Sequence, residues 1–223
     1  MKIYGVFGIG GHAREVLPLV RRQINQANLR DGGSHRMCFV VDDAYMPSER
    51  STNGVQVVST SEFTELEADE KLFAVAIGAP QDRRKVTERL INKGLRPFSV
   101  KASTHVELDC NVIGVGAVFC HFTQITSNIN IGNFFHCNWY SSIGHDCVIG
   151  DYVTFAPGVR CNGNVVIEDE AYIGAGAVIR DGTTRPITIG KGAVIGMGAV
   201  VTKSVDPGVT VIGSPARPLG GKV

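Results

Sequence analysis

The sequence predicts a chain of two folds, an α/β region over residues 1–100 and a prism of short parallel strands over residues 101–223. Two observations lead to this prediction. Strand-like and helix-like apolar segments alternate in the first hundred residues, which is typical of a small, Rossmann-like parallel sheet with helices on its faces. From residue 113 onward an apolar residue recurs at every sixth position, a period that neither a helix nor a simple strand produces.

The composition describes a globular protein with a sizeable apolar core and no strong charge. The chain has 223 residues, of which 43% are hydrophobic and 19% charged, and its formal net charge is +1. Because the sequence has no basic runs, we expect no nucleic-acid partner. We also expect no membrane span, since no apolar run approaches roughly 18 residues, and no signal peptide, so the expected location is the cytoplasm.

The six cysteines predict reduced, packed thiols rather than disulfides or a metal site. They form no Cys-x-x-Cys pair, and two of them, Cys137 and Cys161, fall on inward positions of the repeat described below. Buried thiols of this kind are common in the cores of intracellular proteins. The sequence therefore predicts no bound metal.

Strand and helix signals alternate in the first hundred residues. An apolar run over residues 3–7 ends in a glycine turn, and apolar residues at helical spacing follow from Ala13 to Ile24. Pro18 lies inside this predicted helix and should bend it, because proline removes one backbone hydrogen bond. A second predicted helix ends at Gly94. Further strands are predicted at residues 38–41, 55–58 and 72–77.

An apolar residue occupies every sixth position over twelve consecutive steps of the second region. At an apolar frequency of 43%, the probability of such a run by chance is on the order of 10⁻⁵, so it indicates an internal repeat. Three six-residue steps return the chain above itself, which gives coils stacked as a triangular prism. After Ile179 the phase slips through residues 181–186, which predicts an outward loop. The positions before the slip are Ile113, Phe119, Ile125, Ile131, Cys137, Ile143, Ile149, Phe155, Cys161, Ile167, Ile173 and Ile179.

A glycine or a small polar residue often follows the apolar residue of the repeat directly. We expect these residues to form the corners of the prism, because they adopt left-handed backbone angles at low cost. They are Gly114, Gly132, Asn138, Gly144, Gly150, Asn162, Gly174, Gly190 and Gly196.

The glycine turn after the first strand is a candidate phosphate site. The segment "GIGGHA" at residues 8–13 offers bare backbone amides at the start of a helix, where a phosphate binds readily. Asp42 and Asp43 end the next strand of the same predicted sheet. A dinucleotide-dependent oxidoreductase has the same local features, although the repeat region leaves no ordinary second substrate domain. A turn that needs glycine for packing alone is a further alternative.

His145 is the candidate catalytic base. It follows the inward residue Ile143 by two positions and therefore lies on an outer edge of the prism, where Asp146 can orient its ring. Neutral imidazole has a pKa close to the pH at which it would accept a proton. An inert, solvated histidine is the alternative. A zinc site shared with His121 and His136 is a third reading, which their spacings do not favour.

Several stretches resemble one family of enzymes. The six-residue repeat, the loop at residues 181–186 and the ending "VIGSPAR" resemble the hexapeptide-repeat acyltransferases. The segments "GIGGHA", "VVDD" and "AIGAPQDRRK" resemble the nucleotide-sugar-binding domain of the branch that acetylates UDP-, GDP- or dTDP-linked 4-amino-4,6-dideoxy sugars. The resemblance implies a left-handed parallel β-helix, a homotrimer, and acetyl-CoA as co-substrate.

The resemblance also implies roles for particular residues. His145, in "IGHDCVIG", matches the catalytic base of the family, and Asp146 stands where relatives often have the longer glutamate. Gly163 matches the residue whose amide stabilises the oxyanion, and Thr154 stands where some relatives have a histidine that contacts the acetyl donor. The implied substrate-binding residues are Gly10, Gly11, His12, Asp42, Asp43, Gly78 and Asn138, and those implied to bind acetyl-CoA are Thr154, Gly163, Ala175, Met197 and Arg217.

These observations lead to a functional expectation with two alternatives. We expect an acetyl-CoA-dependent N-acetyltransferase that acts directly on the 4-amino group of a nucleotide-linked sugar, without a metal and without an acyl-enzyme. The first alternative is a related O-acetyltransferase of the sialic-acid type. The second is a nucleotide-sugar-binding scaffold without catalysis. The sequence leaves the nucleobase open, because uracil, thymine and guanine all offer ring N–H donors.

Overall fold

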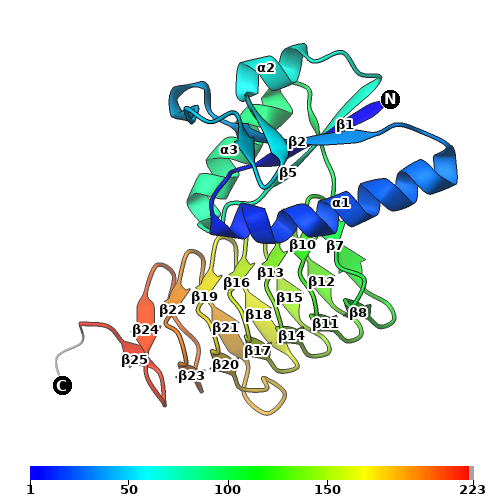
Figure 1. Cartoon of the computed structure of the whole chain (residues 1–223). Coiled ribbons are helices and arrows are strands. Elements are labelled where there is room, and N and C mark those ends of the chain that lie inside the picture. Colours follow the sequence, from blue (N-terminus) through cyan, green and yellow to red (C-terminus); the bar gives the residue numbers. More distant parts are fainter. Residues whose placement is uncertain (221–223) are drawn as a thin grey trace. The chain divides into compact units, whose positions relative to one another are not determined.

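The computed structural model describes residues 1–220 and divides into two compact units. The first unit comprises residues 1–78 and 82–100, and the second comprises residues 79–81 and the chain from residue 101 onward. The first is an α/β unit with a mainly parallel sheet and the second is a left-handed parallel β-helix, as predicted (Figure 1). None of the helices in residues 1–220 is both long and apolar enough to cross a lipid bilayer.

The sheet of the α/β unit has the strand order β3-β4-β2-β1-β5-β6. Neighbouring strands are parallel except β3 and β4, which are antiparallel. The carboxyl ends of β1, β2 and β5 therefore meet at one edge of the sheet, where ligands of such sheets bind. The strands span Lys2–Phe7 (β1), Arg36–Val41 (β2), Ser51–Thr52 (β3), Val55–Ser59 (β4), Glu70–Val75 (β5) and Arg96–Pro97 (β6).

The helices of this unit begin and end where local backbone conformation dictates. Helix α1 (Gly11–Asp31) follows Gly10, whose backbone is extended, and stops at Gly32, which has a left-handed φ of 63°. Pro18 lies inside α1, as expected. The remaining helices are α2 (Thr60–Glu65), α3 (Pro80–Asn92) and the short 3₁₀ helix η1 (Asp43–Tyr45).

Helix α2 was not predicted from the sequence. A capping box holds its first turn: the Glu62 amide donates to Ser59 Oγ at 3.2 Å, and the Ser59 amide donates to Glu62 Oε2 at 2.7 Å. A helix of six residues is too short to show helical periodicity, so the serine and glutamate three residues apart were its only signal.

The β-helix winds through three faces of short, stacked strands (Figure 1), which we number in the order in which each coil visits them. Phe119 pairs with Cys137 and Cys137 pairs with Phe155, so successive coils lie 18 residues apart in register. We call the turn from face 1 to face 2 the 1–2 edge, and the turn from face 2 to face 3 the 2–3 edge. These edges carry the residues discussed below.

The strands of the three faces are short and parallel, apart from the antiparallel β25. Face 1 contains β7 (Val100–Lys101), β10 (Val118–Phe119), β13 (His136–Cys137), β16 (Thr154–Phe155), β19 (Tyr172–Ile173), β22 (Val194–Ile195), β24 (Thr210–Ile212) and β25 (Arg217–Pro218). Face 2 contains β8 (Val106–Glu107), β11 (Gln124–Ile125), β14 (Ser142–Ile143), β17 (Arg160–Cys161), β20 (Val178–Ile179) and β23 (Val200–Val201). Face 3 contains β9 (Val112–Ile113), β12 (Asn130–Ile131), β15 (Val148–Ile149), β18 (Val165–Ile167) and β21 (Ile187–Ile189).

The apolar positions of the repeat line the interior of the prism, as predicted. Ile113 is partly buried, and the later positions from Phe119 to Ile179 are at most 3% exposed. The phase slip is confirmed, because Ile167 pairs with Ile189 and the extra residues lie in the loop between β20 and β21. The six cysteines, all within the described residues, are free thiols, and all but Cys110 are buried.

The glycines that follow the inward residues are not needed for left-handed backbone angles, so the reason given for them in the sequence analysis was wrong. The left-handed residue of a corner stands three positions after the inward residue, as at Phe122, Tyr140 and Asp146, whose φ angles are 59°, 61° and 58°. The glycine that directly follows the inward residue is needed because the next coil lies against it. A β-carbon on Gly144 would come within 2.6 Å of the backbone nitrogen of Gly163.

Replacement of Gly174 by alanine should destabilise the β-helix by about 1–3 kcal/mol, the usual cost of adding a carbon to a packed interior. A β-carbon there would lie 2.6 Å from the backbone oxygen of Ile195 and 2.7 Å from the backbone nitrogen of Met197. Gly192→Asn is the matched control, because Gly192 has a left-handed φ of 65°, no atom near its β-carbon position, and asparagine accepts this conformation. Denaturant unfolding measures both variants, and equal losses of stability would contradict the packing explanation.

Candidate active site

His145 and Asp146 lie in one turn of the 2–3 edge, between β14 and β15. Asp146 is the left-handed residue of this corner, a conformation that aspartate tolerates better than most residues. The Nδ1 atom of His145 lies 2.8 Å from Asp146 Oδ2, and the two side chains are 57% and 48% exposed. The shorter aspartate side chain therefore does contact the histidine ring.

The contact with Asp146 fixes which nitrogen of His145 can accept a proton. An ionised carboxylate only accepts hydrogen bonds, so the neutral ring carries its hydrogen on Nδ1 and keeps a lone pair on Nε2. The hydrogen bond that His145 donates to Asp146 raises the pKa of His145 above its ordinary value, and the negative charges of Asp146 and Asp181 raise it further. The ring is therefore a stronger base than an isolated imidazole.

The Nε2 side of His145 faces Gly163 in the next coil of the same edge. A β-carbon on Gly163 would lie 2.6 Å from Cε1 and 2.7 Å from Nε2 of His145, so a larger residue would displace the ring. Within residues 1–220 the backbone amide of Gly163 has no hydrogen-bond partner. The structure thus brings together His145, Asp146 and Gly163 of the predicted site residues.

Asn138 and Thr154 lie apart from His145 within the β-helix. Asn138 is on the 1–2 edge, where its amide nitrogen donates to the Phe155 backbone oxygen at 2.9 Å and its amide oxygen lies 3.6 Å from Cys120 Sγ. Thr154 belongs to β16 of face 1 and is 1% exposed. Both side chains are buried in the single chain.

The residues expected near acetyl-CoA form a second group. Ala175 and Met197 are exposed on adjacent coils of the 1–2 edge, and Met197 is 82% exposed. Arg217 is exposed in β25 and lines a pocket of about 250 Å³ together with Lys203. Face 2 lies between the two edges, with His145 and Gly163 on one side of it and Ala175 and Met197 on the other.

The glycine turn of the α/β unit is open where a phosphate would approach. No atom lies within 4 Å of the β-carbon positions of Gly10 and Gly11, so packing does not require glycine there. Gly10 stands at the N-terminus of α1, the end of a helix where backbone amides commonly bind an anion. This geometry does not support the alternative in which the turn needs these two glycines for packing alone.

His12 and Gly78 lie beside a buried cation at this end of the sheet. Burial and the charge of Arg83 lower the pKa of His12 to about 4, so its ring is neutral at pH 7. The guanidinium of Arg83 donates to the backbone oxygens of Ile77 at 2.8 Å and Gly78 at 3.2 Å. Arg83 is fully buried and was missed by the sequence analysis, although it lies in the "AIGAPQDRRK" segment.

A pocket of about 690 Å³ opens at the carboxyl ends of β1 and β2. Its wall includes Gly8, Asp42 and Arg89, and the carboxylate of Asp42 forms an ion pair with Arg89. The two predicted base-binding aspartates differ here. Asp43 turns towards α2, where its Oδ1 accepts a hydrogen bond from the Ser61 amide at 3.3 Å, so only Asp42 lines the pocket.

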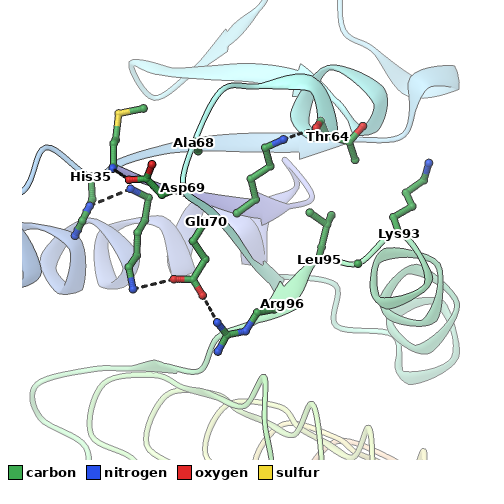
Figure 2. Close-up of a pocket in the computed structure, with 12 residues that line it drawn as sticks. His35, Thr64, Ala68, Asp69, Glu70, Lys93, Leu95 and Arg96 are labelled. Atoms are coloured by element: carbon green, nitrogen blue, oxygen red, sulfur yellow. Dashed lines mark hydrogen bonds and ion pairs between the residues drawn. The ribbon is translucent and has the colours of Figure 1, made fainter.

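A second pocket, of about 670 Å³, lies at the opposite edge of the sheet (Figure 2). Its wall includes Glu70 and Arg96 at the starts of β5 and β6, and Glu70 joins two cations, the Arg96 guanidinium and the Lys2 ammonium, the latter at 2.9 Å. Because this edge is not the one where β1 and β2 end, we do not regard this pocket as the nucleotide site.

The three histidines of the alternative zinc site lie in different parts of the β-helix. His121 is on the 1–2 edge, His136 is buried in face 1 and His145 is on the 2–3 edge. Within residues 1–220 no group of three histidine, cysteine or acidic side chains is arranged to hold a metal ion.

Comparison with known proteins shows the family of the chain. Residues 5–90 match the family model of the PglD N-terminal domain, and residues 164–203 match that of the hexapeptide repeat of succinyl-transferase. The chain is 48% identical over 218 residues to a GDP-perosamine N-acetyltransferase of Escherichia coli O157:H7, an alignment that covers 97% of this chain and 96% of the relative.

Two solved structures are similar over nearly the whole chain. WeeI from Acinetobacter baumannii AYE is 49% identical with a TM-score of 0.91, and the match covers 98% of this chain and 100% of that one. A mutant of perosamine N-acetyltransferase from Caulobacter crescentus, in complex with CoA and GDP-perosamine, is 25% identical with a TM-score of 0.83. This match covers 98% of this chain and 97% of that one. The chain therefore belongs to the hexapeptide-repeat acetyltransferases, in the branch of perosamine- and bacillosamine-type N-acetyltransferases.

Proposed function

We propose that the chain transfers the acetyl group of acetyl-CoA to the 4-amino group of a GDP-linked 4-amino-4,6-dideoxyhexose, with GDP-perosamine as the acceptor. The relative that carries this name is 48% identical over nearly the whole chain. The observation that carries the chemistry is the 2.8 Å contact between His145 and Asp146, which leaves a basic Nε2 on an open edge of the β-helix. These two features together favour an enzyme over a binding scaffold.

His145 acts as the general base in this proposal. The sugar amine is largely protonated at neutral pH and must lose a proton before its nitrogen can attack the thioester carbon. Nε2 of His145 takes that proton, and Asp146 stabilises the imidazolium that forms. The attack gives a tetrahedral intermediate, which collapses to the amide as the C–S bond breaks. The sulfur of CoA leaves as a thiolate and takes up the second proton that the amine nitrogen loses.

The backbone amide of Gly163 is the proposed donor to the oxyanion of this intermediate. It belongs to the coil next to His145 and has no partner within residues 1–220. A fixed backbone donor aimed at a developing negative charge is the usual means of stabilising such an intermediate. Acetyl-CoA would then lie along face 2 towards Ala175, Met197 and Arg217.

The α/β unit is proposed to hold the nucleotide. The open amides at Gly10 and Gly11 suit a pyrophosphate, and Asp42 in the neighbouring pocket suits the ring N–H groups of the base. Guanine offers two adjacent donors on its Watson–Crick edge, which one carboxylate can accept together. Asp43 takes no part in this proposal, because its carboxylate caps backbone groups near α2.

We also propose that the protein is a cyclic homotrimer. Val112, Val148 and Val166 point outward from face 3 and are 65%, 46% and 40% exposed. Parallel pairing stacks them in one uncharged column, with Asn130 between the first two. A second copy of the chain would cover this apolar column and bring its own 1–2 edge towards His145.

The proposed location is the cytoplasm, where acetyl-CoA and nucleotide sugars are produced. Free, buried thiols fit a reducing compartment. The acetylated sugar nucleotide would serve as a donor in the synthesis of a surface polysaccharide.

The proposed reaction is tested by measuring thiol release from acetyl-CoA with a panel of acceptors, using the native protein and His145→Ala. We expect release with GDP-perosamine and none with nucleotide sugars that carry a hydroxyl at carbon 4. His145→Ala should reduce kcat by about 10²- to 10⁴-fold, the usual contribution of a general base. Because the ring is largely exposed, circular dichroism should show an unchanged fold.

The pH profile gives an independent check of the base. Only neutral His145 accepts a proton, so activity should rise with pH through the pKa of the ring, which lies above the ordinary value. Asp146→Asn removes the hydrogen bond that raises this pKa and should move the rising limb to lower pH. Release with hydroxyl acceptors alone would favour O-acetylation, and intact acetyl-CoA across the whole panel would favour the scaffold.

Asp42→Asn should raise the KM for GDP-perosamine about tenfold or more, the effect of losing a hydrogen bond to a charged group. The kcat should fall less, because contacts far from the amine are the same in the ground and transition states. Asp43→Asn is the matched control and should leave the KM nearly unchanged, since Asp43 caps Ser61. Equal effects of the two variants on KM would contradict this assignment.

The double variant Val148→Lys with Val166→Lys should separate the proposed trimer, because two lysines would bury their charges in the contact. Sedimentation velocity should show a smaller species, with acetyl transfer lost along with the trimer. Leu29→Lys is the control, since Leu29 is 87% exposed on α1 and lies outside the column. A double variant that sediments as the native protein does would exclude face 3 from the contact.

A further inference from the structure

The loop between β20 and β21 begins with an acidic residue in the same column as the catalytic histidine. Arg160 pairs with Val178, and Ser142 pairs with Arg160, so His145, Gly163 and Asp181 occupy equivalent positions on three successive coils of the 2–3 edge. The mechanism described above uses the first two. Asp181 is the third, and the phase slip of the repeat starts at it.

Gly163 leaves an open space in which His145 and Asp181 approach each other. The position that a β-carbon on Gly163 would occupy lies 2.7 Å from His145 Nε2 and 3.0 Å from Asp181 Oδ2. Any side chain at residue 163 would separate the two groups. Because glycine stands there, the carboxylate of Asp181 faces the edge of the ring that accepts the proton.

The loop holds the Asp181 carboxylate in this direction. Its Oδ1 accepts a hydrogen bond from the Thr183 amide at 2.8 Å, and the Thr183 hydroxyl accepts one from Asn164 Nδ2 at 2.8 Å. The guanidinium of Arg180 donates to backbone oxygens in and beside the loop, including that of Arg185 at 3.0 Å. The hydrogen bonds from Thr183 lower the pKa of Asp181, so the carboxylate is ionised at neutral pH.

The charge of Asp181 is not neutralised by a cation of the protein. Within residues 1–220 no lysine or arginine nitrogen lies within 4.0 Å of its carboxylate, because Arg180 bonds to backbone oxygens instead. The titratable groups that act on His145 are Asp146 on its Nδ1 side, Asp181 beyond its Nε2 side and the Cys147 thiol. The Nε2 side of the ring therefore meets a negative charge.

We propose that Asp181 is a positioning residue of the acetyl transfer. Its carboxylate stabilises the positive charge, which lies first on the acceptor ammonium and then on the imidazolium of His145. This inference rests on the proposed function. In the transfer, one N–H bond of the ammonium breaks and one N–H bond forms on Nε2, so one positive charge is present before and after the step. A carboxylate beside Nε2 stabilises that charge in both states and draws the ammonium to the base.

The proposal also gives the loop a function. The added residues after Ile179 displace the chain outward only where the next turn of the 2–3 edge would begin, directly above Gly163. The Thr183 amide that holds the carboxylate belongs to this loop. The loop thus acts as the support of a charged group at the active site.

The test compares Asp181→Asn with Asp109→Asn. Asp109 occupies the equivalent position two coils before His145 on the same edge, and Ser127 rather than glycine lies between them. In the first experiment, histidine-labelled full-length protein is titrated by NMR without substrate, and the His145 signal is assigned from its loss in His145→Ala. Asp181→Asn should lower the pKa of His145, because a charge that favours the imidazolium is removed. Asp109→Asn should leave it unchanged.

The second experiment measures the pH dependence of kcat/KM for GDP-perosamine. Asp181→Asn should reduce kcat/KM about three- to tenfold on the plateau, as expected for one partly exposed charge beside the base, and move the rising limb to lower pH. Asp181→Glu should restore part of the activity. A native His145 pKa in Asp181→Asn would overturn the proposal even if the native protein is active. An inactive native protein with the expected NMR shift would overturn the proposed function and leave the contact between the two residues intact.

Discussion

The close stacking of one coil on the next is the constraint on which the rest of the β-helix depends. Backbone atoms of adjacent coils approach so closely that a β-carbon at Gly144, Gly150 or Gly174 would lie within 2.7 Å of a neighbour. An 18-residue register over most of the β-helix keeps inward side chains above one another and satisfies this spacing, and the longer spacing across the phase slip does the same because the extra residues lie in a loop. Residues at equivalent positions of an edge are therefore stacked on successive coils. Their side chains form a column without any additional structural element.

This register explains how a scaffold of short strands can hold an active site. His145, Gly163 and Asp181 are far apart in sequence for a local motif, yet they share one column because each lies one coil above the last. The glycine in the middle serves two purposes, since it provides space for the ring and a backbone amide beside it. In the α/β unit, the parallel pairing of the strands likewise brings distant residues together, because it places Gly8 and Asp42 at one edge of the sheet.

The sequence predicted the features that depend on a single position of the repeat. The six-residue period identified the inward positions of the prism, the phase slip identified the loop, and the "HD" pair predicted the contact between His145 and Asp146. The features it missed depend on contacts between distant residues. One of them is the hydrogen bond that the Ser61 amide donates to the Asp43 carboxylate. The pairing of Asp42 with Arg89 and the burial of Arg83 follow from the packing of α3, which composition does not reveal.

The exposure of His145 in the single chain indicates why its site needs two carboxylates. If a second copy covers the 2–3 edge, as proposed, the ring loses water, and loss of water lowers the pKa of a histidine. A covered histidine is a weaker base, as in His12, where burial and then the charge of Arg83 lower the pKa to about 4. Asp146 acts on one nitrogen and Asp181 on the other side of the ring, and both oppose that effect. The base can then be shielded from water and still accept a proton near neutral pH.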